Sequence, residues 1–100
     1  TPGFLAPEVL DRKGHGAPSD VWALGCTVYL SLTGSPPFEA GERQELNRRI
    51  RAGLFPPSPH LSPPARALLA LLLAPDPAAR PSLRDLLLHR FFTQVWGRRE

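Results

Sequence analysis

The chain has 100 residues, a formal net charge of +3 and one cysteine, Cys26, so it forms one small domain at most and holds neither a disulfide framework nor a cysteine-pair zinc site. The three histidines lack ligand spacing, which argues against a metal site, and the dispersed arginines lack interleaved aromatic residues, which argues against nucleic-acid binding. No apolar run is long enough to cross a membrane, so we expect a soluble protein of the cytoplasm, the nucleus or both.

The first 17 residues are predicted to hold one short helix between two loops. Pro2 and Gly3 indicate an ordered loop over residues 1–5. Pro7 suits the first turn of a helix over residues 6–10, because its missing N–H is not needed there. The polar, glycine-bearing stretch that follows is typical of a second loop.

The segment from about Ser19 to Thr33 is predicted to be a buried helix around which the rest of the chain is arranged. Its large apolar residues point in nearly every direction around a helix, so no face of ordinary width is left for solvent. Ser19 or Asp20 is expected to cap its N-terminus, and Gly34 to end it. Gly25 suits the close approach of another backbone, or is simply a weak point in the helix.

Proline-rich loops separate this central helix from the next predicted helix. Pro36 and Pro37 cannot continue a helix, because each lacks a donor N–H and restricts the residue before it. Phe38 is expected to fill the core. A helix over residues 42–51 follows and ends at Gly53.

Two serine caps predict a pair of antiparallel helices nearer the C-terminus. Ser62 precedes Pro63, which suits the first helical position, and Pro75 stops this helix. Ser82 begins the second helix and has Asp85 as its capping-box partner.

Three arginines cluster on the predicted helix over residues 42–51: Arg48, Arg49 and Arg51. A solvated face is the simpler interpretation, since charge runs on helices are usually hydrated. A docking surface for an acidic substrate segment or partner is the alternative.

Three motifs occur in the order and approximate spacing of eukaryotic protein kinases, and the chain resembles that family. They are Thr1-Pro2-Gly3-Phe4-Leu5-Ala6-Pro7-Glu8, Ser19-Asp20-Val21-Trp22-Ala23-Leu24-Gly25 and Asp76-Pro77-Ala78-Ala79-Arg80-Pro81. Shorter runs are most similar to the polo-like kinases, among them Pro36-Pro37-Phe38-Glu39 and His89-Arg90-Phe91-Phe92.

The resemblance implies a mostly α-helical fold, namely a partial C-terminal lobe of a Ser/Thr protein kinase domain, with the central helix surrounded by short helices and proline-rich loops. Residues 1–94 would run from the end of the activation segment through the last helices of the lobe. Residues 95–100 depart from the polo-like pattern and form a divergent tail. Because the chain starts without Met, we expect it to be a fragment.

The resemblance also assigns roles to particular residues. Those that match the substrate-recognition loop are Thr1, Gly3, Phe4 and Leu5, and those that match structural supports are Glu8, Asp20, Trp22 and Arg80. Asp20 would accept hydrogen bonds from the backbone of the catalytic loop, with an ordinary helix cap as the alternative. Glu8 and Arg80 would form a buried two-pronged ion pair, and the alternative is two surface charges.

Phosphoryl transfer needs parts that this sequence lacks: a glycine-rich loop, the phosphate-binding lysine, the catalytic-loop aspartate and the Mg²⁺-binding aspartate. No catalytic, cofactor-binding or metal-binding residue is therefore expected within the chain, and ATP and Mg²⁺ would bind in the full kinase only. Its partners would be protein substrates and the missing N-lobe and catalytic-loop part of the same domain.

The parent is expected to transfer the γ-phosphoryl group of ATP to protein Ser or Thr, while this chain alone is inactive. Two alternatives remain at this point. One is a non-catalytic kinase relative that acts as a protein-interaction module, and the other is a free-standing helical adaptor.

Overall fold

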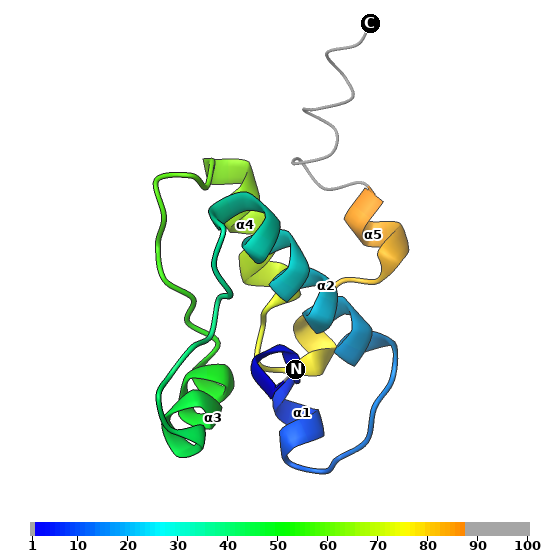
Figure 1. Ribbon diagram of the computed structural model, residues 1–100. Helices are drawn as coiled ribbons and strands as arrows, with labels where there is room; N and C mark the ends of the chain where they lie inside the picture. The colour runs from blue at the N-terminus through cyan, green and yellow to red at the C-terminus, as the bar shows by residue number, and fades with distance from the viewer. Residues whose placement is uncertain (1, 88–100) are drawn as a thin grey trace, which may run out of the picture.

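The computed structural model describes residues 2–87, and within this range the chain is helical and contains no strand (Figure 1). The predicted mostly α fold is confirmed. The helices are α1 (Pro7–Leu10), α2 (Ala17–Thr33), α3 (Arg43–Ala52), α4 (Pro63–Leu72) and α5 (Leu83–Leu87), with short 3-10 turns at Pro2–Phe4 and Pro77–Ala79.

Helix α2 begins two residues earlier than predicted. Its N-cap is Gly16 rather than Ser19 or Asp20, so that prediction was wrong. Pro18 lies in the first turn, where a missing N–H does no harm, and the helix therefore extends past it toward the glycine. Ser19 instead lies in the first turn and accepts a long hydrogen bond of 3.4 Å from the Gly16 N–H. Gly34 ends the helix in the left-handed conformation, as predicted.

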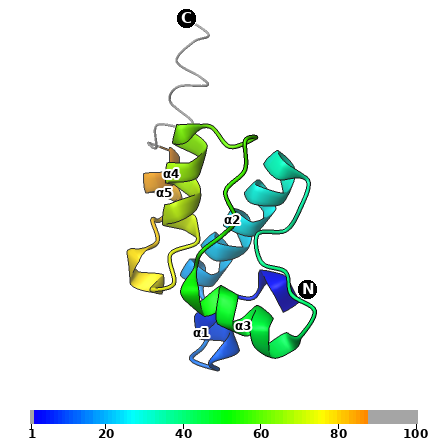
Figure 2. The same cartoon turned by 90° about the vertical axis from the view of Figure 1, so that its left-hand side faces the viewer.

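Helix α4 lies alongside α2 (Figure 2), and the core forms between them. Gly25 allows this close approach, because a Cβ there would lie 2.8 Å from Leu72 Cβ and 2.9 Å from Leu73 Cδ2. Phe38 is buried and stacks on Trp22 with ring centroids 5.4 Å apart, so its predicted place in the core is confirmed.

One face of α2 is open in the described part of the chain, contrary to the expectation of a helix with no solvent face. Leu24 and Leu30 are 39% and 37% exposed, and Thr27 lies exposed between them. Spacings of three residues place these side chains on the same side of the helix. Val21, by contrast, is buried in a cluster with Leu68 and Leu72 of α4 and Leu86 of α5.

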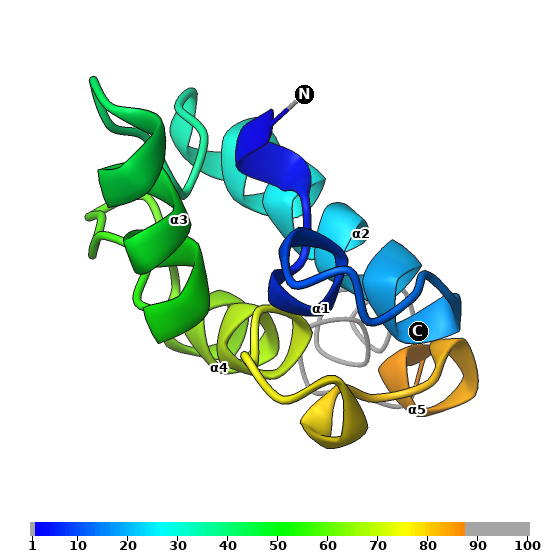
Figure 3. The ribbon, with the colours of Figure 1, turned by 90° about the horizontal axis from the view of Figure 1, so that it is seen from below.

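Helix α3 contacts α1, and Figure 3 shows both helices from below. Its Ile50 is fully buried, while Arg51 Nη2 lies 2.7 Å from Asp11 Oδ1 just after α1. Gly53 ends α3 in the left-handed conformation, as predicted.

The predicted serine caps near the C-terminal end are present. Ser62 Oγ accepts a hydrogen bond from Ala65 N–H at the start of α4, and Ser82 Oγ accepts one from Asp85 N–H at the start of α5. Across the described residues, none of the helices combines the length and apolar character that crossing a bilayer requires.

Candidate functional site

Arg80 is the centre of the candidate site, and its guanidinium is fully buried. The residue follows the 3-10 turn Pro77–Ala79, which Asp76 caps by accepting a hydrogen bond from Ala78 N–H. From there the side chain enters the molecule and donates to four carbonyl or carboxylate groups. The acceptors are the backbone oxygens of Ala74 (2.8 Å), Pro18 (2.9 Å) and Pro75 (3.3 Å) and the carboxylate of Glu8.

The Arg80 guanidinium makes as many hydrogen bonds as it has N–H donors. Nε donates once, Nη1 donates twice and Nη2 donates twice, which uses all five N–H groups of a guanidinium. A buried cation with no spare donor avoids the cost of an unsatisfied polar group. A lysine offers only three donors from one point and could not reproduce this set.

Glu8 meets the guanidinium with both of its oxygens. Arg80 Nη1 donates to Oε2 at 2.7 Å and Nη2 donates to Oε1 at 2.9 Å, so the predicted two-pronged pair is present. Ser19 Oγ donates a third hydrogen bond, to Oε2 at 2.8 Å. Burial by itself would raise the pKa of Glu8, but the hydrogen bonds from Arg80 and Ser19 outweigh it and lower the pKa to about 2. The carboxylate is thus ionised at neutral pH.

Trp22 lies next to this ion pair and connects it with the core. The Arg80 guanidinium carbon lies 4.9 Å from the centroid of the Trp22 ring, within cation–π range, and the same ring stacks on Phe38. The backbone at Phe38 in turn lies close to Gly3, where an added Cβ would be 3.1 Å from the Phe38 carbonyl oxygen. Contacts therefore run without a break from the ion pair through the core to the N-terminal segment.

The comparisons with known proteins agree with these features. A model of the protein kinase domain matches residues 1–92. The chain belongs to the protein kinase family. Its fold is part of the helical C-lobe, with Glu8 in the Ala-Pro-Glu motif that the sequence indicated.

The curated relatives are polo-like kinases. The chain is 56% identical over 94 residues to the inactive serine/threonine-protein kinase PLK5 of Mus musculus, an alignment that covers 94% of the chain and 16% of the relative. It is 47% identical over 94 residues to the serine/threonine-protein kinase PLK2 of Mus musculus (94% and 14%) and 43% identical over 93 residues to PLK1 of Xenopus laevis (93% and 16%). The chain thus spans about 14–16% of the length of these relatives.

The other residues assigned by resemblance differ in how far they are buried. Phe4 is partly buried against the core, while Leu5 is 41% exposed. Asp20 is not part of the pair: its side chain is 74% exposed, and Oδ1 lies 3.3 Å from His15 Nε2. Thr1 lies outside the described residues, as does the tail over residues 95–100.

Several members of the site were missed by sequence reasoning. Ser19 was interpreted as a cap, because nothing in the sequence indicates a hydroxyl partner 11 positions away. The backbone oxygens of Pro18, Ala74 and Pro75 carry no sequence signal as acceptors. Their positions depend on how the loop before α2 and the loop after α4 converge.

The polar groups at this site are occupied by one another. Within residues 2–87 no group of three or more His, Cys, Asp and Glu side chains lies close enough together to hold a metal ion. Glu8 and Arg80 satisfy each other, so neither is available to a phosphate or a cation. The pair joins α1 to the segment after the 3-10 turn Pro77–Ala79.

Proposed function

We propose that this segment is the structural base of a polo-like Ser/Thr protein kinase and that it holds the end of the substrate-recognition loop in place. The observation that supports this most strongly is Arg80, whose five N–H groups all bond Glu8 and three backbone carbonyls. Glu8 lies in α1, just beyond the loop residues, and Arg80 follows the 3-10 turn after α4, so the pair fixes the loop to the helical base across 72 positions of sequence.

The parent kinase transfers the γ-phosphoryl group of ATP to Ser or Thr of protein substrates in this proposal. Phosphoryl transfer depends on accurate positioning of the substrate against the phosphate-binding groups, which lie elsewhere in a kinase domain. The residues of this chain contribute by keeping the loop at Gly3, Phe4 and Leu5 in a constant position. The chain alone is inactive.

A non-catalytic relative that works as an interaction module is the rival function. The relatives include one whose name says it is inactive and others named as Ser/Thr kinases, so similarity by itself does not separate the two. An exchange experiment tests whether this segment can serve as the base of an active kinase. The matched segment of PLK2 of Mus musculus is replaced by residues 1–94 of this chain, and phosphorylation of casein is measured.

The exchanged kinase should retain activity if the segment is a competent base. In that background Arg80→Lys should remove most of the activity, because lysine cannot make the two-pronged bond in a desolvated place, whereas Arg43→Lys on the exposed start of α3 should change little. A folded but inactive exchanged protein would favour the interaction module. Equal effects of the two substitutions would contradict the role of the Glu8–Arg80 pair.

The isolated chain supplies the complementary arm of the same test. Titration of a fluorescent ATP analogue with Mg²⁺ should give no saturable signal, because the phosphate-binding groups are absent from the sequence. Saturable, Mg²⁺-dependent binding would show that the chain contains a nucleotide site that its residues do not suggest.

A further inference from the structure

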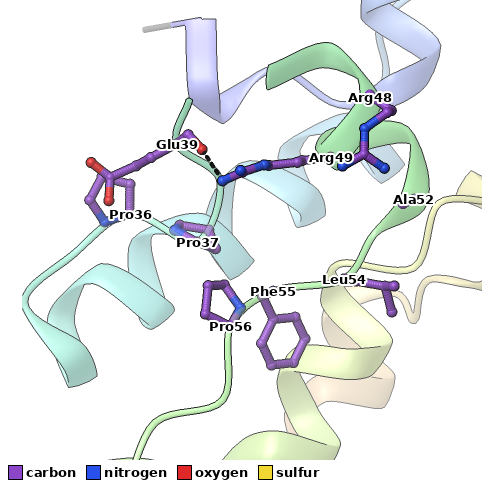
Figure 4. Close-up of a pocket in the computed structure, with 9 residues that line it drawn as sticks. All are labelled: Pro36, Pro37, Glu39, Arg48, Arg49, Ala52, Leu54, Phe55 and Pro56. Carbon is purple, nitrogen blue, oxygen red and sulfur yellow. Dashed lines mark hydrogen bonds between the residues drawn. The ribbon is translucent and has the colours of Figure 1, made fainter. Parts of the chain in front are cut away.

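Two hollows in the described part of the chain differ in what their charged residues already bind. The larger, about 360 Å³, lies beside Phe55 between the loop after α2 and the segment after α3. Figure 4 shows the bond from Arg49 to the Glu39 backbone oxygen at its edge. Arg48 and Arg49 both bond Glu45 as well, and Glu39 lines the same groove. The charges here offset one another, so this groove indicates no particular ligand.

The smaller hollow, about 230 Å³, lies beside the Glu8–Arg80 pair. Its lining includes Glu8 and Ser19, together with Lys13 and His15 from the loop between α1 and α2. Water can therefore approach the Glu8 carboxylate from this side, although the pair is otherwise buried. Among the described residues, the side chains that donate a hydrogen bond to this carboxylate are those of Arg80 and Ser19.

The hydroxyl of Ser19 serves mainly as a donor to Glu8. Its bond to Glu8 Oε2 is 2.8 Å long, the ordinary length for O–H···O, whereas its bond from the Gly16 N–H is 3.4 Å long, beyond the ordinary range for N–H···O. Ser19 is only 5% exposed, so water offers its hydroxyl little alternative. A role as helix cap therefore does not account for this buried serine.

Consecutive residues in the first turn of α2 hold the two partners of the ion pair. Arg80 Nη1 donates to the Pro18 backbone oxygen at 2.9 Å and to Glu8 Oε2 at 2.7 Å, and Ser19 donates to the same Oε2. A hydrogen bond to an ionised carboxylate is stronger than one between neutral groups. Burial raises the pKa of Glu8, and the bonds from Arg80 and Ser19 together lower it to about 2.

We propose that Ser19 is a positioning residue for the substrate-recognition loop, because its hydroxyl fixes the Glu8 carboxylate in the orientation that meets Arg80 and ties the start of α2 to this pair. The inference rests on the proposed function, since Glu8 lies just beyond the loop at residues 3–5. Without the hydroxyl, Oε2 has a free acceptor position that water from the hollow can take. The two-pronged bond then opens more often, and the loop is held less firmly.

The first arm of the test follows the guanidinium protons of Arg80 by heteronuclear NMR in the full 100-residue chain at neutral pH. Ser19→Ala should speed the exchange of the Arg80 Nη protons with water at least about threefold, through local opening of the pair. The amide proton of Cys26, in the middle of α2, should change by less than about twofold. A general loosening of the fold would speed both exchanges alike, so their ratio separates positioning from a merely structural role.

A matched control and a second variant accompany this measurement. Ser31 lies on the same helix, and its hydroxyl donates to the Thr27 backbone oxygen, so Ser31→Ala should leave the Arg80 exchange within about twofold. Ser19→Cys fills the position with a weak donor, and it should speed the exchange as Ser19→Ala does. Near-ultraviolet circular dichroism verifies that each variant is folded. Arg80 protons that exchange as slowly in both Ser19 variants as in the native chain would overturn the proposal.

The second arm uses the PLK2 exchange protein described above. Ser19→Ala should raise KM for casein at least about threefold, more than it lowers kcat, because the loop contacts the substrate and not the phosphate-binding groups. An unchanged KM together with faster Arg80 exchange would overturn the role of Ser19 in the loop. An exchange protein that is inactive with Ser19 in place would contradict the proposed function, and the Arg80 exchange would still decide whether Ser19 positions Glu8.

Discussion

A single guanidinium determines how the N-terminal segment is held. Arg80 reaches Glu8, Pro18, Ala74 and Pro75 at once because its donors form a planar fork with fixed directions. The carboxylate of Glu8 is the only charged acceptor in that set. Stability should therefore depend on the ionisation of Glu8 as well as on the presence of Arg80.

Lowering the pH should destabilise the chain in a defined window. The folded-state pKa of Glu8 is about 2 and its ordinary value is 4.5, so the stabilisation is complete above about 4.5 and is lost as the pH falls toward 2. Melting temperatures measured across this range should fall for the native chain. Glu8→Gln should melt at a lower temperature at neutral pH and should respond less to acid.

Glu45→Gln is the matched control for this pH experiment. The Glu45 carboxylate also has a pKa of about 2, but it lies on the exposed rim of α3 with Arg48 and Arg49. This variant should keep most of the acid-dependent loss seen in the native chain. Parallel pH profiles for Glu8→Gln and the native chain would show that Glu8 is not the group responsible.

At the scale of elements, the packing of α2 on α4 depends on one missing side chain. Gly25 lies against Leu72 and Leu73, and a Cβ there would come closer to both than real Cβ atoms ordinarily do. Leu72 Cβ is attached directly to the α4 backbone, and the Leu73 side chain is buried in the core, so neither atom can easily move. This contact explains a glycine inside a 17-residue helix, where glycine is otherwise unfavourable.

Gly25→Ala should destabilise the chain by roughly 1–3 kcal/mol, the usual range for overpacking a core, although alanine is the better helix former. Gly41→Ala is the control, because Gly41 has nothing within 4 Å of an added Cβ and its φ is not in the left-handed region. Urea unfolding followed by circular dichroism measures both. A Gly25→Ala variant as stable as Gly41→Ala would mean that α2 and α4 are farther apart than the structure places them.

At the scale of the whole molecule, helix ends marked by local signals were predicted well, whereas the bond from Ser19 to Glu8 was not. Ser62, Ser82, Gly34 and Gly53 mark helix ends through bonds within a few positions, and all four lie where the sequence indicated. The start of α2 was misplaced because Ser19 has the chemistry of a cap, while its hydroxyl bonds Glu8 instead.

The Glu8–Arg80 pair itself was predicted from the motifs of the kinase resemblance, not from periodicity. The open face at Leu24 and Leu30 and the groove beside Phe55 could not be predicted, because both depend on how far neighbouring elements reach over α2 and α3. The chain closes on itself where Glu8 and Arg80 meet, 72 positions apart.

A double-mutant cycle on Glu8 and Arg80 tests the closure most directly. The free energy of unfolding in urea is measured for the native chain, Glu8→Gln, Arg80→Met and the double variant. Each single change should cost about 3–5 kcal/mol because it leaves a buried charged or polar partner unsatisfied. The double variant should cost less than the sum by at least about 1 kcal/mol. Single losses below about 1 kcal/mol that simply add would show an exposed, uncoupled pair and would contradict the account.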